Sequence, residues 1–181
     1  MGCHSTKKNI IKKEIKIMEL TFAPKDILQI DDARIIFRNF RGEASKYNNE
    51  GNRNFALIIP NEEMAEELTK RGWNVKIKPP RDDEDDPFMY LPVKVKFNDR
   101  GPAIYLQTGK ARNRLTEDVV GCLDNIDISS VDMDIRPYDW VLQEGTPNEK
   151  SGRTAYLQSM LVVQEIDRFA EQYAEEEYPE E

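Results

Sequence analysis

The sequence predicts a mainly β fold that contains one short helix and one hydrophobic core. Short runs rich in β-branched and aromatic residues recur from residue 33 onward, and turn-forming Gly, Pro and Asn separate them. Only one stretch has clear helical spacing, and the chain lacks the strand-helix alternation of a parallel α/β sheet. We therefore expect a small antiparallel barrel with an inserted helix. An OB-type barrel is the leading candidate, and an SH3-like barrel or a β-sandwich are the alternatives.

The first predicted unit is a hairpin followed by the helix. Residues 34–41 and 53–60 are rich in strand formers, and a polar, Gly-containing loop joins them. Asn61 is placed to cap a helix whose first turn holds two Glu residues and which ends before Gly72. Its apolar side contains Met64, Ala65 and Leu68.

Two alternating stretches follow the helix. In residues 73–78 the alternation predicts that Trp73, Val75 and Ile77 face the core, while Asn74, Lys76 and Lys78 face solvent. In residues 90–97 it places Val93, Val95 and Phe97 inside and two Lys residues outside. The turn at 98–102 contains Gly and Pro, so we expect it to form a second hairpin with residues 103–107.

Two longer strands complete the predicted barrel. Residues 125–141 alternate weakly and are interrupted at Pro137, and residues 153–166 form the last strong strand. In that strand Leu157, Leu161 and Val163 are expected on one side and Thr154, Tyr156 and Gln158 on the other. The chain then divides into a basic arm or leader at 1–18, a barrel domain at 19–166 and an acidic tail at 167–181.

Charge is distributed unevenly along the chain. Residues 165–181 contain eight acids and one Arg, which accounts for most of the formal net charge of -8. The run from Asp82 to Asp86 is a second acidic segment, which we expect to be a solvated loop. Residues 34–54 and 94–114 are basic, with five and six cations respectively. Because two basic stretches lie inside an acidic protein, the net charge does not exclude a nucleic-acid partner.

The residues that usually carry catalysis are scarce. The single histidine is His4, so the domain has no histidine for a general base or a zinc site. Gly109 and Lys110 lack the upstream Gly of a phosphate-binding loop. Cys3 and Cys122 do not suggest a disulfide framework. We expect a cytoplasmic protein that is not an enzyme and that uses no metal or cofactor.

Cations and aromatic residues suggest a surface for single-stranded nucleic acid, which needs positive charge for phosphates and flat rings for bases. Outward strand positions provide Lys and Tyr, and the two basic stretches add further cations. Phe40 and Phe55 are included because Arg residues flank them. The candidate residues are Arg38, Phe40, Arg41, Lys46, Tyr47, Arg53, Phe55, Lys76, Lys78, Lys94, Lys96, Tyr105, Lys110, Arg112, Arg114 and Tyr156.

The order of these elements resembles that of phage and prophage single-stranded DNA-binding proteins. The shared features are an early Arg-rich aromatic hairpin, the late strand Ser151-Gly-Arg-Thr-Ala-Tyr-Leu-Gln-Ser-Met-Leu-Val-Val163, and an acidic tail. The resemblance implies an OB-fold core that coats single strands without sequence preference in replication and recombination. It also implies a tail that binds protein partners. By similarity the DNA-binding face includes Arg41, Lys46, Tyr47, Arg53, Lys94, Lys96, Lys110, Arg112 and Tyr156, and the partner-binding tail includes Glu175, Glu176, Glu177, Tyr178, Glu180 and Glu181. This tail ends in Tyr-Pro-Glu-Glu, whereas family tails often end in an aromatic residue.

Two other functions are compatible with parts of the sequence. An acidic adaptor or DNA-mimic inhibitor would explain residues 82–86 and the tail, but it leaves the basic stretches unexplained. The start Met1-Gly-Cys-His-Ser-Thr6 fits a short N-myristoylation pattern beside a Lys-rich segment, which would bring the chain to a membrane surface. No stretch is long and apolar enough to span a membrane. The sequence defines no oligomeric state and is compatible with a homodimer.

Overall fold

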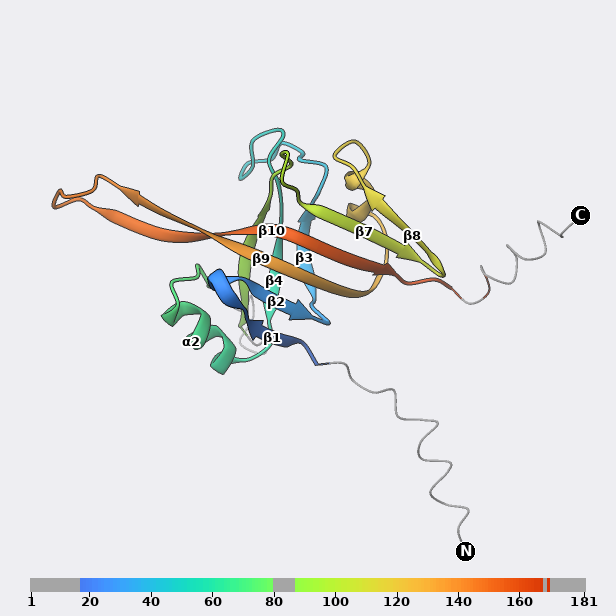
Figure 1. Cartoon of the computed structure of the whole chain (residues 1–181), viewed down its shortest axis with the longest axis horizontal. Coiled ribbons are helices and arrows are strands. Elements are labelled where there is room, and N and C mark those ends of the chain that lie inside the picture. Colours follow the sequence, from blue (N-terminus) through green and yellow to red (C-terminus); the bar gives the residue numbers. More distant parts are fainter. Residues whose placement is uncertain (1–16, 80–86, 168, 170–181) are drawn as a thin grey trace, which may run out of the picture.

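A computed structural model of the chain describes residues 17–79, 87–167 and 169. Within these ranges, ten strands form a single sheet and α2 (Glu62–Lys70) is the one α-helix that is described over its whole length (Figure 1). The strands are β1 (Glu19–Phe22), β2 (Leu28–Asp31), β3 (Ile35–Asn39), β4 (Arg53–Ile59), β5 (Lys76–Lys78), β6 (Phe88–Val95), β7 (Ala103–Thr108), β8 (Ala111–Leu115), β9 (Ile128–Leu142) and β10 (Lys150–Gln164). Two short 3₁₀ turns are η1 (Pro24–Asp26) and η2 (Val120–Asp124).

The sheet closes on itself as an OB-type barrel. Its strands follow the order β2-β9-β10-β6-β4-β3, and β2 leads directly into β3. At this junction the Ala33 amide donates a 2.8 Å hydrogen bond to the carbonyl of Val131 in β9. The bent segment β2–β3 thus acts as the first barrel strand and pairs with β9 at one end and β4 at the other. Parallel pairing of β6 with β10 completes the five-stranded Greek-key path of an OB fold, so the predicted fold class is confirmed.

One core fills the barrel. It is built from the inward residues of every long strand, including Leu57, Val93, Ile135 and Val162, and none of the described residues in it is charged. Phe40 and Phe55 stack on each other in this core with ring centroids 5.4 Å apart.

The helical elements cover two parts of the barrel. In α2 the Asn61 side chain accepts a hydrogen bond from the Met64 amide, as predicted, and Ala65 and Leu68 are buried. The turn η2 follows β8 and precedes β9 in the sequence. Both Val120 and Leu123 are fully buried, so η2 packs into the core. No helix in the described ranges is long and apolar enough to cross a membrane.

The first hairpin is confirmed, but the second is wrong. Strands β3 and β4 pair antiparallel, as expected. In contrast β6 and β7 do not pair with each other: each runs parallel to a different half of β10, and β7 forms its hairpin with β8. The turn at 98–102 therefore moves the chain along the edge of β10.

Three positions depart from simple alternation. Ile77 was expected in the core but is 66% exposed, because β5 is a short edge strand paired only with β6. A bulge between Leu157 and Ser159 in β10 reverses the alternation, so Met160 and Val162 are buried in place of Leu161 and Val163. Pro137 does not interrupt β9, because its pairing with β2 ends at Ile135 and no neighbour on that side needs the missing N–H.

Candidate nucleic-acid interface

A row of polar and aromatic side chains crosses the outer face of four barrel strands. Asn54 of β4 is paired with Lys94 of β6, Lys94 with Tyr156 of β10, and Tyr156 with Arg136 of β9. Paired residues in adjacent strands project from the same face. Lys94 alternates with buried Val93 and Val95, so this face is the outer one. We call these four residues the central row; four strands at about 4.8 Å spacing make it about 14 Å wide.

Tyr156 lies between cations in this row. The guanidinium carbon of Arg136 is 5.2 Å from the centre of the Tyr156 ring, and Lys94 is its partner on the other side. The ring of Tyr138 meets Tyr156 edge to face with centroids 6.0 Å apart and is itself 54% exposed. Alternating cations and accessible rings match the alternating phosphates and bases of a single nucleic-acid strand.

The β3–β4 loop borders one end of the central row. The Asn54 amide donates a 3.0 Å hydrogen bond to the side-chain oxygen of Asn48 in this loop, which ties the loop to the row. Tyr47 is 90% exposed, and the Lys46 ammonium lies 5.7 Å from its ring centre. The loop therefore presents one more ring and cation, both of which the sequence identified.

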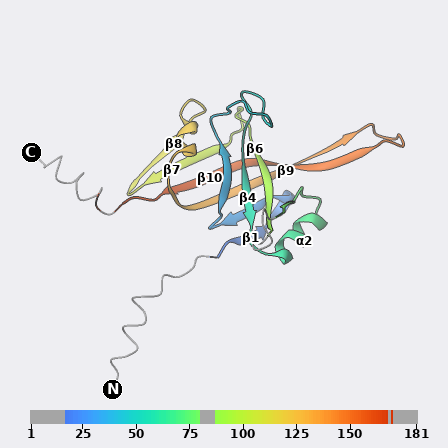
Figure 2. The same ribbon diagram turned by 180° about the vertical axis from the view of Figure 1, so that it is seen from behind.

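An arm projects beyond the barrel from the other side of the row. It consists of the outer halves of β9 and β10, from Tyr138 to Arg153, and extends past every other described element (Figures 1 and 2). Trp140 is paired with Gly152 and donates from Nε1 to Thr154 Oγ1 at 3.1 Å. A Cβ on Gly152 would lie only 2.4 Å from Trp140 Cζ2, so the indole occupies the space beside this glycine.

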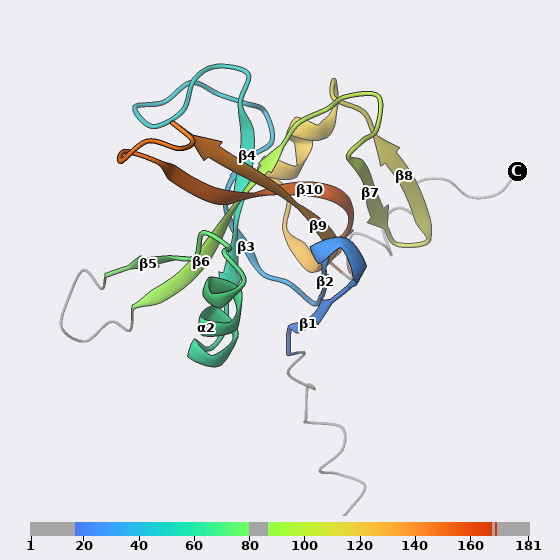
Figure 3. The ribbon, with the colours of Figure 1, turned by 60° about the vertical axis from the view of Figure 1, so that its left-hand side comes forward.

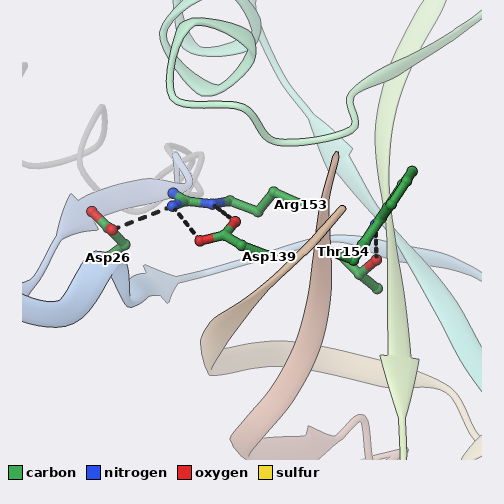
Figure 4. Close-up of polar contacts among 5 residues, drawn as sticks. Asp26, Asp139, Arg153 and Thr154 are labelled. Atoms are coloured by element: carbon green, nitrogen blue, oxygen red, sulfur yellow. Dashed lines mark hydrogen bonds and ion pairs between the residues drawn. The ribbon is translucent and has the colours of Figure 1, made fainter. Parts of the chain in front are cut away.

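A cluster of charged residues fixes the base of the arm to the barrel (Figure 4). Arg153 donates two hydrogen bonds to Asp139, at 2.7 and 3.0 Å, and one to Asp26 at 3.3 Å. Its guanidinium also lies 5.4 Å from the ring centre of buried Trp73. The hydrogen bonds from Arg153 lower the pKa of the Asp139 carboxyl, and those to Asp139 raise the pKa of Arg153.

Several predicted binding residues are used by the fold instead. Phe40 and Phe55 are buried, so the prediction that they stack on bases is wrong. Arg38 donates from Nη1 to the carbonyls of Leu123 and Ile126, at 2.7 and 2.8 Å, and thereby holds η2 against β3.

Arg41 and Arg53 lie beside acids. Both line a pocket of about 250 Å³ that also contains Glu117 and Asp118. Arg53 is paired with Glu117 at 3.0 Å, and Arg41 lies 3.8 Å from Glu43. These acids reduce the positive potential that the two Arg residues would otherwise offer to phosphates.

The remaining candidates flank the central row. Lys96 is exposed just beyond β6, and Lys76 and Lys78 lie on β5 in register with outward residues of β6. In the β7–β8 hairpin, Tyr105 is paired with Arg114, and Lys110, Arg112 and Arg114 are exposed. This hairpin pairs with Ser159 to Val163 of β10, which is the end of that strand away from the arm.

Sequence reasoning missed the contribution of β9. Arg136, Tyr138 and Trp140 were not candidates, because Pro137 suggested that the strand stopped there. The signal was present in the alternation of buried Val131, Met133 and Ile135, which continues outward past the proline. On the same outer face, Asp134 and Asp132 follow Arg136 towards the start of β9, so the positive part of this strand ends at the central row.

The acidic segments at 82–86 and 168–181, apart from Phe169, lie outside the described residues, as does the basic arm at 1–16. Within the described part, no group of three His, Cys, Asp or Glu side chains is arranged to hold a metal ion, and Cys122 is a free thiol.

Comparison with known proteins gives the family. Residues 18–181 match the family model described as "Putative phage ssDNA-binding domain". Two solved structures of the single-stranded DNA-binding protein from bacteriophage Enc34 are similar. The structure in complex with ssDNA has a TM-score of 0.51 at 14% identity and covers 85% of this chain and 95% of that one. The C-terminal truncation has a TM-score of 0.49 at 15% identity, with 84% and 93% covered.

At these identities the structural likeness to the DNA complex supports the fold alone, and no curated protein matches the chain. The family model, by contrast, spans the whole barrel and the tail, including all four residues of the central row. The chain therefore belongs to the family of phage single-stranded DNA-binding domains.

Proposed function

We propose that this protein binds single-stranded DNA across the outer face of β4, β6, β10 and β9, and that it coats the strand without sequence preference. The observation that carries the proposal is the central row, in which Tyr156 lies in register between Lys94 and Arg136. Family membership supports the same ligand. Phosphate charge and a ring face are common to every nucleotide, so we expect stacking and charge to dominate the interaction.

The binding mechanism combines two physical terms. Lys94 and Arg136 neutralise phosphates and release counterions, which makes the affinity fall as salt rises. Tyr156, Tyr138 and Tyr47 offer ring faces to bases, and each stacked base contributes roughly 1 to 3 kcal/mol. Binding by these terms is stoichiometric and involves no chemical turnover. Coating would keep the strand free of secondary structure during phage DNA replication and recombination in the host cytoplasm.

The acidic tail has a separate role in this proposal. Its charge supports the recruitment of replication and recombination proteins and competition with DNA for the cationic face. Residues 167–181 contain seven acids and one Arg, so the tail should repel phosphates, and we assign DNA binding to the barrel.

The direct test is fluorescence anisotropy with labelled oligo-dT of about 30 nucleotides, which exceeds the roughly 4 to 16 nucleotides covered by one OB fold. The same strand as a duplex serves as the control, at several salt concentrations. We expect tight, salt-sensitive binding to the single strand and weaker binding to the duplex. No binding at low salt, with or without the tail, would contradict the proposal and favour the acidic adaptor.

Two variants connect the binding to the central row. Tyr156→Ala should weaken the affinity roughly 5-fold to 150-fold, the equivalent of one stacked base, whereas Tyr156→Phe should retain most of it. Lys94→Gln should make the dependence of log K on log salt shallower by about 0.7, the value for one phosphate contact on a single strand. Lys70→Gln on α2 is the matched control, because it removes an exposed Lys outside the proposed face.

A further inference from the structure

A second aromatic cluster lies on the face of β6 that also carries the central row. Phe88, Tyr90 and Lys94 project outward along this strand and alternate with buried Leu91 and Val93. At the start of the strand, the ring of Phe37 from β3 lies 6.3 Å from Phe88 and 5.9 Å from Tyr90, between centroids. Phe88 and Tyr90 are 5.9 Å apart.

A cation from a third strand accompanies the rings. Lys78 of β5 is paired with Phe88, and its ammonium lies 5.0 Å from the ring centre of Phe37 and 5.6 Å from that of Phe88. Figure 3 shows β5, β6 and α2 forming a wing that diverges from the β9–β10 arm. Phe88, Tyr90 and Lys78 lie on this wing and are half-buried, and Phe37 lies beside them on β3 and is exposed.

The backbone of Phe37 is strained at this surface. Its φ of 51° lies in the left-handed region, which bulky side chains avoid. It lies in the irregularity of β3, between the paired residues Ile36 and Asn39, and remains 53% exposed. A role in packing alone would favour a regular strand with the ring turned inward. Strained residues that the fold nevertheless retains are frequent at binding sites.

We propose that Phe37, Phe88 and Tyr90 form a second base-stacking subsite for single-stranded DNA, with Lys78 beside the phosphate. This inference rests on the proposed function and extends its footprint along β6. Six residues separate Phe88 from Lys94, which corresponds to about 20 Å of strand. A short oligonucleotide therefore fills the central row alone, and only a longer one reaches both positions.

The test measures affinity against oligo-dT length, from about 4 to about 30 nucleotides, for the full-length protein and its variants. Phe37→Asn removes the ring and tolerates the left-handed backbone, so the relieved strain offsets part of the lost ring contacts, and thermal unfolding should show that the variant still folds. We expect Phe37→Asn to weaken binding of long strands by about tenfold, the effect of losing one stacked base, and to leave short strands unaffected. Phe37→Trp should restore the affinity for long strands. Ile77→Ala, an exposed apolar residue on the same wing, is the matched control and should change neither.

The outcomes separate this subsite from the proposed function. If the native protein binds at every length and Phe37→Asn binds long strands equally well, the subsite is wrong and the central row stands. If Phe37→Asn weakens short and long strands alike, the cluster is not a separate subsite, and the inference is again overturned. If the native protein binds no single strand, the proposed function fails and the subsite fails with it. Tyr156→Ala should weaken binding at every length, which identifies the central row independently.

Discussion

The side of the strand on which Tyr156 lies could be predicted from the sequence, but its neighbours in the sheet could not. Alternation in the sequence placed it on the outer side of its strand, and the structure confirms this side. The sequence could not show that Lys94 and Arg136 would lie on either side of it, because strand pairing joins distant segments of the chain. Phe40 and Phe55 illustrate the opposite error, since adjacent Arg residues suggested a surface role for rings that are buried. For an aromatic residue, strand parity is thus a better guide to exposure than the charge of its sequence neighbours.

Gly152 is required because of the indole that lies beside it. In Gly152→Ala the new methyl group would lie within 2.4 Å of Trp140 Cζ2, so the indole must move and lose its hydrogen bond to Thr154. We expect a destabilisation of about 1 to 3 kcal/mol, the usual effect of overpacking. Thermal unfolding measures this loss, and a change in Trp emission at low temperature reports the displaced ring. Ser151→Ala, at the exposed neighbouring position, should leave both unchanged.

Asp139 should make stability depend on pH in the acid range. Its pKa is lowered in the folded state, so the native protein binds fewer protons than the unfolded chain around that pKa. The contribution is therefore complete above the ordinary Asp pKa of about 4 and is lost as the pH falls through the lowered folded value. Because Asp139 is mostly exposed, we expect only about 0.5 to 1 kcal/mol. Melting temperatures of the native protein and Asp139→Asn should differ at pH 7 and converge as the pH falls through the lowered pKa; a constant difference would contradict this assignment.

At the scale of elements, local signals predicted strands and the helix well but predicted pairing less reliably. Asn61, the apolar side of α2 and the β3–β4 hairpin depend on short-range patterns, and all are confirmed. The pairing of β6 and β7 with β10 instead depends on the length of β10 and on its bulge, neither of which the turn at 98–102 encodes. A turn rich in Gly and Pro therefore shows that the chain changes direction, without identifying the strand it joins.

Arg38 anchors η2, so its replacement should lower the stability of the protein without lowering its affinity for DNA. Arg38→Ala would leave the carbonyls of Leu123 and Ile126 without their donor, beside the buried core. We expect a destabilisation of about 1.5 to 3 kcal/mol, typical of hydrogen bonds to a charged group. DNA affinity of the remaining folded protein should stay within about twofold of the native value, because the guanidinium faces η2 rather than solvent. Denaturant unfolding and anisotropy test the two parts. Arg34→Ala, an exposed Arg just before β3, is the control for charge alone.

At the scale of the whole molecule, positive and negative charges are separated. The outer face collects cations from several strands, whereas the acids of the tail are concentrated at the end of the sequence. In the sequence this division is visible only as two basic stretches in an acidic chain. The sequence could not predict that Arg41 and Arg53 would be partly neutralised by acids while Arg136 would join the row.

Removal of residues 168–181 tests competition between tail and DNA. The segment contains six acids and one Arg, and truncation before Arg168 preserves the hydrogen bond from the Glu165 amide to the Asp127 carbonyl. We expect tighter binding at low salt and a smaller difference at high salt, where charges are screened beyond about 3 Å at 1 M. A full-length variant with Gln at every tail Glu should behave like the truncation if charge is responsible. Equal affinity of native and truncated protein across the salt series would contradict competition.

The central row joins residues from the early, middle and last strands of the barrel, so it exists only after β10 has entered the sheet. An oligonucleotide that recognises this row is consequently a ligand of the completely folded chain alone. At a free concentration of about 100 times the Kd, it should increase the free energy of unfolding by about 2.7 kcal/mol. During synthesis, a nascent chain that still lacks β10 would therefore have no central row to offer to DNA. The proposed site is thus completed in the same step in which the chain finishes folding, and an excess of single strands should shift the folding equilibrium towards the native state.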